Sequence, residues 1–169
     1  MKRHLSGLLM AATLVFSAPS ALADEGRYLR SLGGSWSGTG TVLVRTSSSP
    51  VTVTCHFTSN ASASSLALDG KCRGLLVISR SIGSRLKSSG GKYSGTYTGS
   101  SSGVAQLTGT RRGNALNLAI RWAKNVNGDR SAQLTLEKVG TDGMKLSTTD
   151  IDPKTGKAVT TSEINLRRS

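Results

Sequence analysis

The feature that most constrains this chain is an alternation of apolar and small polar residues with a period of two. It begins near residue 35 and continues to the end of the sequence, and it is clearest over residues 51–58, where Val, Cys and Phe alternate with Thr and His. A period of two is typical of β-strands that bury one face. Turn residues interrupt the pattern at short intervals, so the sequence predicts about nine or ten short strands.

The connections between these expected strands are short, which favours antiparallel pairing because a parallel pair needs a crossover of about a dozen residues or more. A meander of such strands either folds into a two-sheet sandwich or closes on itself, and closure removes exposed edges. We therefore expect an all-β fold, an antiparallel up-and-down β-barrel of about 8–10 strands, with the sandwich as the alternative. A helix of one or two turns precedes it, because Tyr28, Leu29 and Leu32 can share one face before Gly33 and Gly34 end the helix.

The first 23 residues have the organisation of a signal peptide. A basic start with Lys2 and Arg3 leads into an apolar run, and Ala21 and Ala23 form a small-x-small cleavage pattern. We expect cleavage after Ala23, an N-terminal segment with a short helix over residues 24–34, and a single barrel domain over residues 35–169. No later segment approaches the length of a transmembrane helix, so we expect a periplasmic or secreted protein with no transmembrane span.

Only two cysteines occur, Cys55 and Cys72, and in an oxidising compartment such a pair predicts a disulfide. If the strands around them form a hairpin that turns at residues 62–65, Cys55 lies opposite Cys72 and Phe57 opposite Gly70. Both cysteines are then on the apolar face, at a separation that a disulfide can bridge. The alternative is two separate buried thiols. A zinc site is disfavoured, because His56 is the only nearby nitrogen ligand and zinc takes four ligands.

The sequence offers few groups for acid–base or nucleophilic chemistry. Once a signal peptide is removed, His56 is the single histidine, and it lies on the Thr-rich face of its expected strand. The Asp residues mostly fall in expected turns, where Asp normally accepts backbone hydrogen bonds. We therefore expect a non-enzymatic protein with no catalytic residues, no metal site and no cofactor.

Basic residues outnumber acidic ones by 22 to 9, and they are concentrated in the middle third of the chain. A field of this sign attracts polyanions. The expected partners are anionic envelope components such as lipopolysaccharide, acidic polysaccharide or an anionic membrane surface, and the alternative is a solvated surface with no partner. Nucleic acid is not an expected partner, because stacking aromatics are not interleaved with the basic residues. The candidate anion-binding residues are Arg73, Arg80, Arg85, Lys87, Lys92, Arg111, Arg112, Arg121, Lys124 and Arg130.

The start of the first expected strand, Gly34-Ser35-Trp36 after a helical turn, resembles the Gly-x-Trp signature of the lipocalins and the wider calycin group of barrels. The resemblance implies that Trp36 closes one end of the barrel and that a basic residue of the last strand lies across its ring. Arg167 and Arg168 are the candidates for that residue. The chain departs from the family at Ile151, where the second lipocalin motif has an aromatic residue, and it has no long helix after the barrel.

The opening also resembles bacterial periplasmic metalloprotease inhibitors, which are small exported barrels with one disulfide. That resemblance implies that residues 24–32 enter a protease cleft. The sequence therefore leaves two functions open. One is a calycin-like binding protein for a small amphipathic ligand or an anionic envelope component, and the other is a protease inhibitor or an envelope-associated interaction protein.

The residues expected to face the barrel interior share an apolar character and leave open whether the interior is filled or holds a ligand. They are Val42, Val44, Val53, Phe57, Leu66, Leu68, Tyr93, Leu116, Leu118, Ile120, Leu134 and Leu146.

Overall fold

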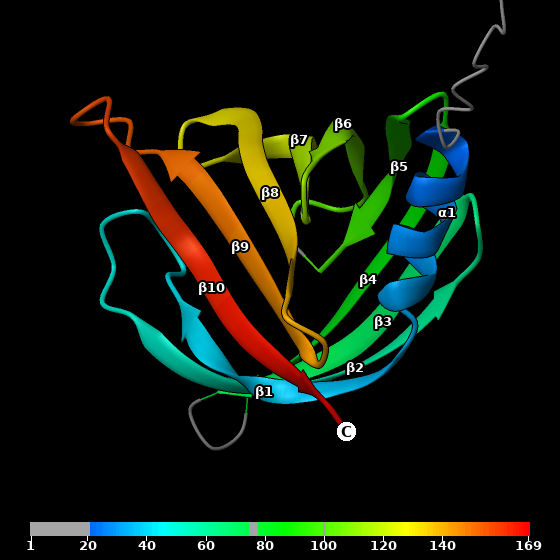
Figure 1. Cartoon of the computed structure of the whole chain (residues 1–169). Coiled ribbons are helices and arrows are strands. Elements are labelled where there is room, and N and C mark those ends of the chain that lie inside the picture. The colour runs from blue at the N-terminus through cyan, green and yellow to red at the C-terminus, as the bar shows by residue number, and fades with distance from the viewer. Residues whose placement is uncertain (1–20, 75–77, 100) are drawn as a thin grey trace, which may run out of the picture.

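The computed structural model describes residues 21–74, 78–99 and 101–169, and it shows one helix and a closed barrel of ten antiparallel strands (Figure 1). The helix is α1 (Ala21–Ser31). The strands are β1 (Gly34–Val42), β2 (Val51–Ala61), β3 (Ser65–Gly74), β4 (Ile78–Ser89), β5 (Lys92–Thr98), β6 (Ala105–Arg112), β7 (Ala115–Val126), β8 (Asp129–Val139), β9 (Gly143–Ile151) and β10 (Ala158–Arg168).

Each strand pairs with its neighbours in the sequence, and β1 also pairs with β10, which closes the barrel. The all-β antiparallel barrel is therefore confirmed and the two-sheet sandwich is not the fold. Residues 75–77, part of the apolar run at residues 75–78, lie outside the described residues, and β4 begins at the last position of that run.

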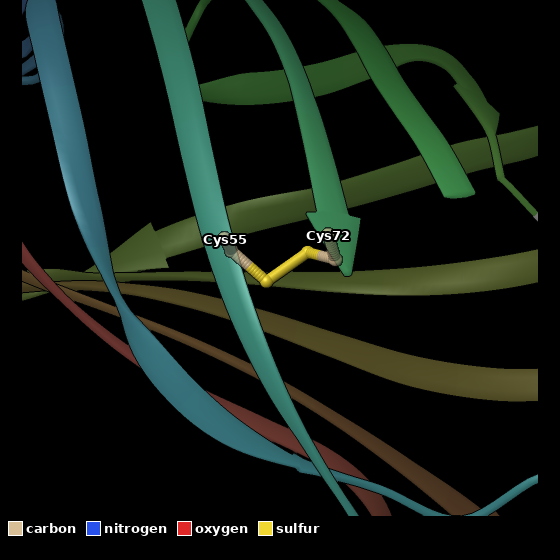
Figure 2. The surroundings of a disulfide bond; sticks show 2 residues. All are labelled: Cys55 and Cys72. Atoms are coloured by element: carbon tan, nitrogen blue, oxygen red, sulfur yellow. A yellow bond between two sulfur atoms is a disulfide. The ribbon is translucent and has the colours of Figure 1, made fainter. Parts of the chain in front are cut away.

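The hairpin of β2 and β3 has the register that the cysteines predicted. Cys55 pairs with Cys72 and Phe57 with Gly70, and the turn lies between Ala61 and Ser65. The two cysteines form a disulfide that projects from adjacent strands, with both residues buried (Figure 2). The alternative of two free thiols is thus wrong.

Removing this disulfide should destabilise the fold, because the bond limits the freedom of the unfolded chain between residues 55 and 72. For a loop of this size the expected loss is about 3 kcal/mol of unfolding free energy. The measurement is urea unfolding of the Cys55→Ala/Cys72→Ala variant against the oxidised protein. Reduced wild-type protein is the matched control and should fall close to the double variant. Equal midpoints for oxidised and reduced protein would contradict the expectation.

Two glycines allow the strands to bend enough to close. A Cβ built at Gly38 would lie 1.9 Å from the carbonyl oxygen of Asn165, and one at Gly95 would lie 1.8 Å from that of Arg85. Both contacts are with the backbone of the neighbouring strand, so no side chain fits there without moving that strand. Glycine in a strand interior often marks such a close approach.

The antiparallel order places the connections at two opposite ends of the barrel. We call one the helix end, because α1 packs there against the β2–β3 turn, the start of β5 and the turn between β6 and β7. The start of β1 and the end of β10 lie at the same end. We call the other the open end; it carries the connections β1–β2, β3–β4, β5–β6, β7–β8 and β9–β10.

The helix is longer than the one or two turns we expected, since α1 spans 11 residues. Tyr28, Leu29 and Leu32 are buried on one face, as predicted. Gly26 is unfavourable in a helix, but a Cβ there would lie only 3.1 Å from the Cβ of Ala63, so its small size lets the helix pack closely on the barrel. The first three residues of α1 precede the expected cleavage site, and the other eight, residues 24–31, make about two turns.

One expected interior residue is misplaced. Val44 lies beyond the end of β1 and is 77% exposed. The backbone N–H of Leu43 still donates to the carbonyl of Thr161, after which the chain leaves the sheet as the β1–β2 loop. The alternation of valines continues in sequence after the strand pairing has stopped, which explains the error.

Within the described ranges, α1 is the only helix, and it is neither long nor apolar enough to cross a membrane.

Candidate functional site

The helix end is closed around Trp36, which is 1% exposed. Its Nε1 donates a hydrogen bond to the carbonyl of Leu32 at 3.0 Å. The guanidinium of Arg168 lies over the ring at 4.4 Å from its centroid, and the amine of Lys138 lies 5.7 Å from the same centroid. Arg167, the other candidate, pairs with Ser37 and is exposed. Arg168 is therefore the basic residue that lies across the ring.

A buried ion-pair cluster fixes α1 to the barrel at the same end. Glu25 is 8% exposed and accepts hydrogen bonds from the Tyr93 hydroxyl and from Nε of Arg111, the latter at 2.9 Å. Arg111 also pairs with Asp24, and its guanidinium lies 4.8 Å from the centroid of the Tyr28 ring. This end of the barrel is thus held shut by packing, hydrogen bonds and charge together.

Burial raises the pKa of the Tyr28 hydroxyl well above its usual range, although the nearby Arg111 opposes that shift. The hydroxyl therefore stays protonated at any physiological pH. It lies within hydrogen-bond distance of the carbonyl oxygens of Asn114 and Leu136, and donates to them. The hydrogen bonding of Tyr28 therefore does not depend on pH in that range.

The segment that would enter a protease cleft in an inhibitor lies within α1 and the residue after it. Tyr28, Leu29 and Leu32 are buried in the core. Residues 24–32 do not protrude from the barrel in this structure.

The open end differs, because inward-facing apolar side chains there are only partly buried. They belong to six different strands and pack against the edge of the core: Val42, Val51, Ile82, Tyr97, Val126 and Leu134. Each of these side chains keeps part of its surface accessible to solvent, whereas the core residues of the helix end are almost fully buried.

An aromatic pair forms part of this wall. Tyr97 of β5 and Trp122 of β7 meet edge to face, with ring centroids 6.0 Å apart. β6 lies between β5 and β7, and its Ala105 pairs with Tyr97 and is fully buried. The small side chain of Ala105 leaves room for the two rings to touch. Burial raises the pKa of the Tyr97 hydroxyl, which therefore stays protonated.

Trp122 carries an unsatisfied donor. The residue is 6% exposed, and its indole Nε1 has no hydrogen-bond partner among the described residues. A buried polar group without a partner costs about 1–3 kcal/mol, and such groups are rare in folded proteins. The sequence carries no signal for this missing partner, because it depends on the residues that surround the ring.

Arg80 is one of the charged residues on the inward register near the open end, together with Arg130 of β8, which donates to the Trp122 carbonyl, and the buried Asp150 of β9, which accepts from Asn127. Arg80 pairs with the inward-facing Cys72 and is exposed, and it lies two positions before Ile82 on the same strand. A cation at this place lies at the entrance to the apolar wall.

The ten candidate anion-binding residues do not form one surface. Arg111 is engaged with α1, and Arg80 is at the open end. Arg85 pairs with Asp69 at 2.8 Å, and Nε of Arg130 donates to the carbonyl of Trp122. The other six are exposed and spread over β3 to β7: Arg73, Lys87, Lys92, Arg112, Arg121 and Lys124. The alternation of strand faces and the curvature of the barrel separate residues that are close in sequence.

Within the part of the chain that the structure describes, no three His, Cys, Asp or Glu residues come together in a way that could hold a metal ion. His56 is exposed on the outer face of β2.

Comparison with known proteins identifies the fold but no sequence family. No protein-family model and no curated protein matches this chain. The crystal structure of Rv2717c from M. tuberculosis is similar, with a TM-score of 0.68 and 16% identity over 85% of this chain and 96% of that one. The S-type phycobiliprotein lyase CPES from Guillardia theta has a TM-score of 0.55 and 11% identity, over 89% of this chain and 98% of that one. Both are lipocalin-like ten-stranded barrels.

This comparison corrects one expectation. We expected a non-enzymatic protein because the sequence lacks clustered catalytic groups, and that inference is wrong, since a protein named as a lyase has this kind of barrel. A scarcity of histidines and clustered carboxylates therefore does not exclude enzymatic chemistry in the fold. The shared barrel is also consistent with ligand binding.

Proposed function

We propose that this protein binds a small amphipathic ligand inside the barrel, through the open end. The observation that carries the proposal is the contrast between the two ends: Trp36 and α1 close one, while inward-facing Leu134, Ile82 and Tyr97 remain partly exposed near the other. A barrel of eight strands has just enough interior for side chains or one small ligand, and ten strands enclose more. The wall of apolar side chains would bury the hydrocarbon part of the ligand, at about 0.8 kcal/mol for each CH₂ group.

Two groups support a polar part in the same ligand. The unpaired Nε1 of Trp122 would gain a partner if the ligand presents an oxygen acceptor, which would offset the cost of that buried donor. Arg80 at the entrance would favour an anionic end group. A carboxylate or phosphate on an apolar chain has both properties.

We further propose that the protein works outside the cytoplasm, with the signal peptide cleaved after Ala23. The disulfide between Cys55 and Cys72 supports this, because such bonds persist in oxidising compartments.

The proposal can be tested with an anionic probe, 11-(dansylamino)undecanoic acid, whose fluorescence rises in an apolar site. We expect saturable binding that Leu134→Trp abolishes, because the added ring fills the half-exposed part of the interior. Ala119→Trp is the matched control, since it places the same ring on the exposed outer face of β7. Equal binding by both variants would place the probe on the outer surface and contradict the proposal.

Trp122→Phe tests the polar part of the ligand. The variant keeps an aromatic ring but removes Nε1, so we expect about tenfold weaker binding of the anionic probe, the equivalent of roughly 1.4 kcal/mol. A purely hydrocarbon probe should bind both proteins equally. Native mass spectrometry of protein recovered from its own cells would then show the mass of the natural ligand.

A further inference from the structure

The outer face of β2 and β3 carries two adjoining hollows, and the core residues Trp36 and Phe57 contribute to the lining of the first. The first has a volume of about 470 Å³ and the second about 410 Å³. His56 and Lys71 line both of them. These two residues are directly opposite each other in the β2–β3 register, so the hollows meet along that pair.

Cationic side chains surround this surface. Arg73 lines the second hollow, two residues from Lys71 on the same face of β3. Arg167 of β10 belongs to the same cross-strand row, which runs from Arg167 through Ser37 and His56 to Lys71. With neighbouring strands about 4.8 Å apart, this row spans about 14 Å. We call Arg167, His56, Lys71 and Arg73 the outer basic row.

The single carboxylate side chain that lines the hollows is already engaged. Asp69 pairs with Arg85 at 2.8 Å. The remaining lining includes hydroxylated side chains such as Thr54 and Thr58, and two aromatic side chains, Trp36 and Phe57, that are buried and so present no exposed ring. The surface thus offers positive charge and hydroxyl groups at regular strand spacing.

We propose that the outer basic row binds an acidic polysaccharide, with its carboxylates on Lys71 and Arg73 and its hydroxyls on the Ser and Thr side chains between them. Charge complementarity supports an extended polyanion, since the cations Arg167 of β10 and Lys71 and Arg73 of β3 lie at the two sides of a four-strand surface, with Ser37 and His56 between them. The six aromatic side chains of the described residues are buried or face the barrel interior, so this face lacks the rings on which single-stranded nucleic acids stack.

The inference is independent of the proposed ligand in the barrel, because the two sites are on opposite faces of the strands. Sequence reasoning included Arg73 among the anion-binding candidates but not Lys71 or His56. Their contribution follows from the register, which brings residues 15 positions apart into one pair.

The experiment measures binding of polygalacturonate, a polymer of uronic acid, by titration calorimetry at several salt concentrations. Lys71→Ala/Arg73→Ala should weaken binding about tenfold at low salt. It should also reduce the slope of log K against log salt by about 1.5, the value for two lost cation contacts. The matched control is Arg121→Ala/Lys124→Ala, which removes the same charge from β7 and should change affinity less than about twofold.

Three outcomes would overturn the proposal. The first is no binding of polygalacturonate by the wild-type protein. The second is an equal loss of affinity in the two double variants, which would make net charge the cause. The third is tighter binding of phosphatidylglycerol vesicles or single-stranded DNA than of the polyuronate under the same conditions. Unchanged thermal unfolding of both variants, expected for exposed residues, ensures that each result reports on binding.

Discussion

Trp36→Ala is expected to lower the free energy of unfolding by about 4 kcal/mol, the largest effect of any single substitution considered for this barrel. The substitution leaves a cavity in a site that is 1% exposed, and it removes the hydrogen bond from Nε1 to the Leu32 carbonyl. It also leaves Arg168 and Lys138 close together without the ring between them. Burial and Arg168 already lower the pKa of Lys138, so the loss of the aromatic face leaves two cations in mutual repulsion.

Urea unfolding followed by circular dichroism measures this loss. Trp36→Phe is the matched control, because it keeps an aromatic ring under Arg168 and removes mainly the indole hydrogen bond. We expect Trp36→Phe to cost about 1–2 kcal/mol, clearly less than alanine. If alanine and phenylalanine were equally destabilising, the packing and cation contacts of the ring would contribute little, contrary to this account.

The second large effect is expected at Arg111. In Arg111→Ala, Glu25 remains buried with only the Tyr93 hydroxyl as a side-chain partner, and an uncompensated buried charge is costly. We expect a loss of about 3 kcal/mol, accompanied by detachment of α1 from the helix end.

Arg112→Ala is the matched control, because Arg112 is exposed at the next position and its loss should change stability by less than about 0.5 kcal/mol. Adding Glu25→Gln to Arg111→Ala should restore part of the loss by removing the buried charge. A double-mutant cycle over the two sites gives their coupling. Additive effects would show that the ion pair does not stabilise the contact between α1 and the barrel.

Features that involve residues close to one another in the sequence could be predicted, because those residues alone determine them. The β2–β3 register follows from the turn at residues 62–65 and the alternation on either side, so the pairing of Cys55 with Cys72 could be predicted from the sequence. Closure was harder to predict, because the alternation is the same in a barrel and in a sandwich. The deciding contact, β1 with β10, joins residues more than a hundred positions apart.

The candidate sites were less predictable for the same reason. The basic residues between Arg73 and Arg130 are close in sequence, yet alternate faces and successive strands send Arg80 to the open end and Arg111 to the helix end. The close packing of α1 on the barrel depends on the contact of Gly26 with Ala63, which no local pattern contains. The unpaired Nε1 of Trp122 is likewise a property of its surroundings and not of its strand.

The pairing of β1 with β10 also affects how the protein can be made. The strand that closes the barrel is the last one to be synthesised, so the closed sheet cannot form while that strand is absent. Until then β1 has an unpaired edge, and Trp36 lacks Arg168. Pairing strands from the two ends of a chain also slows folding, because a long loop must be ordered first.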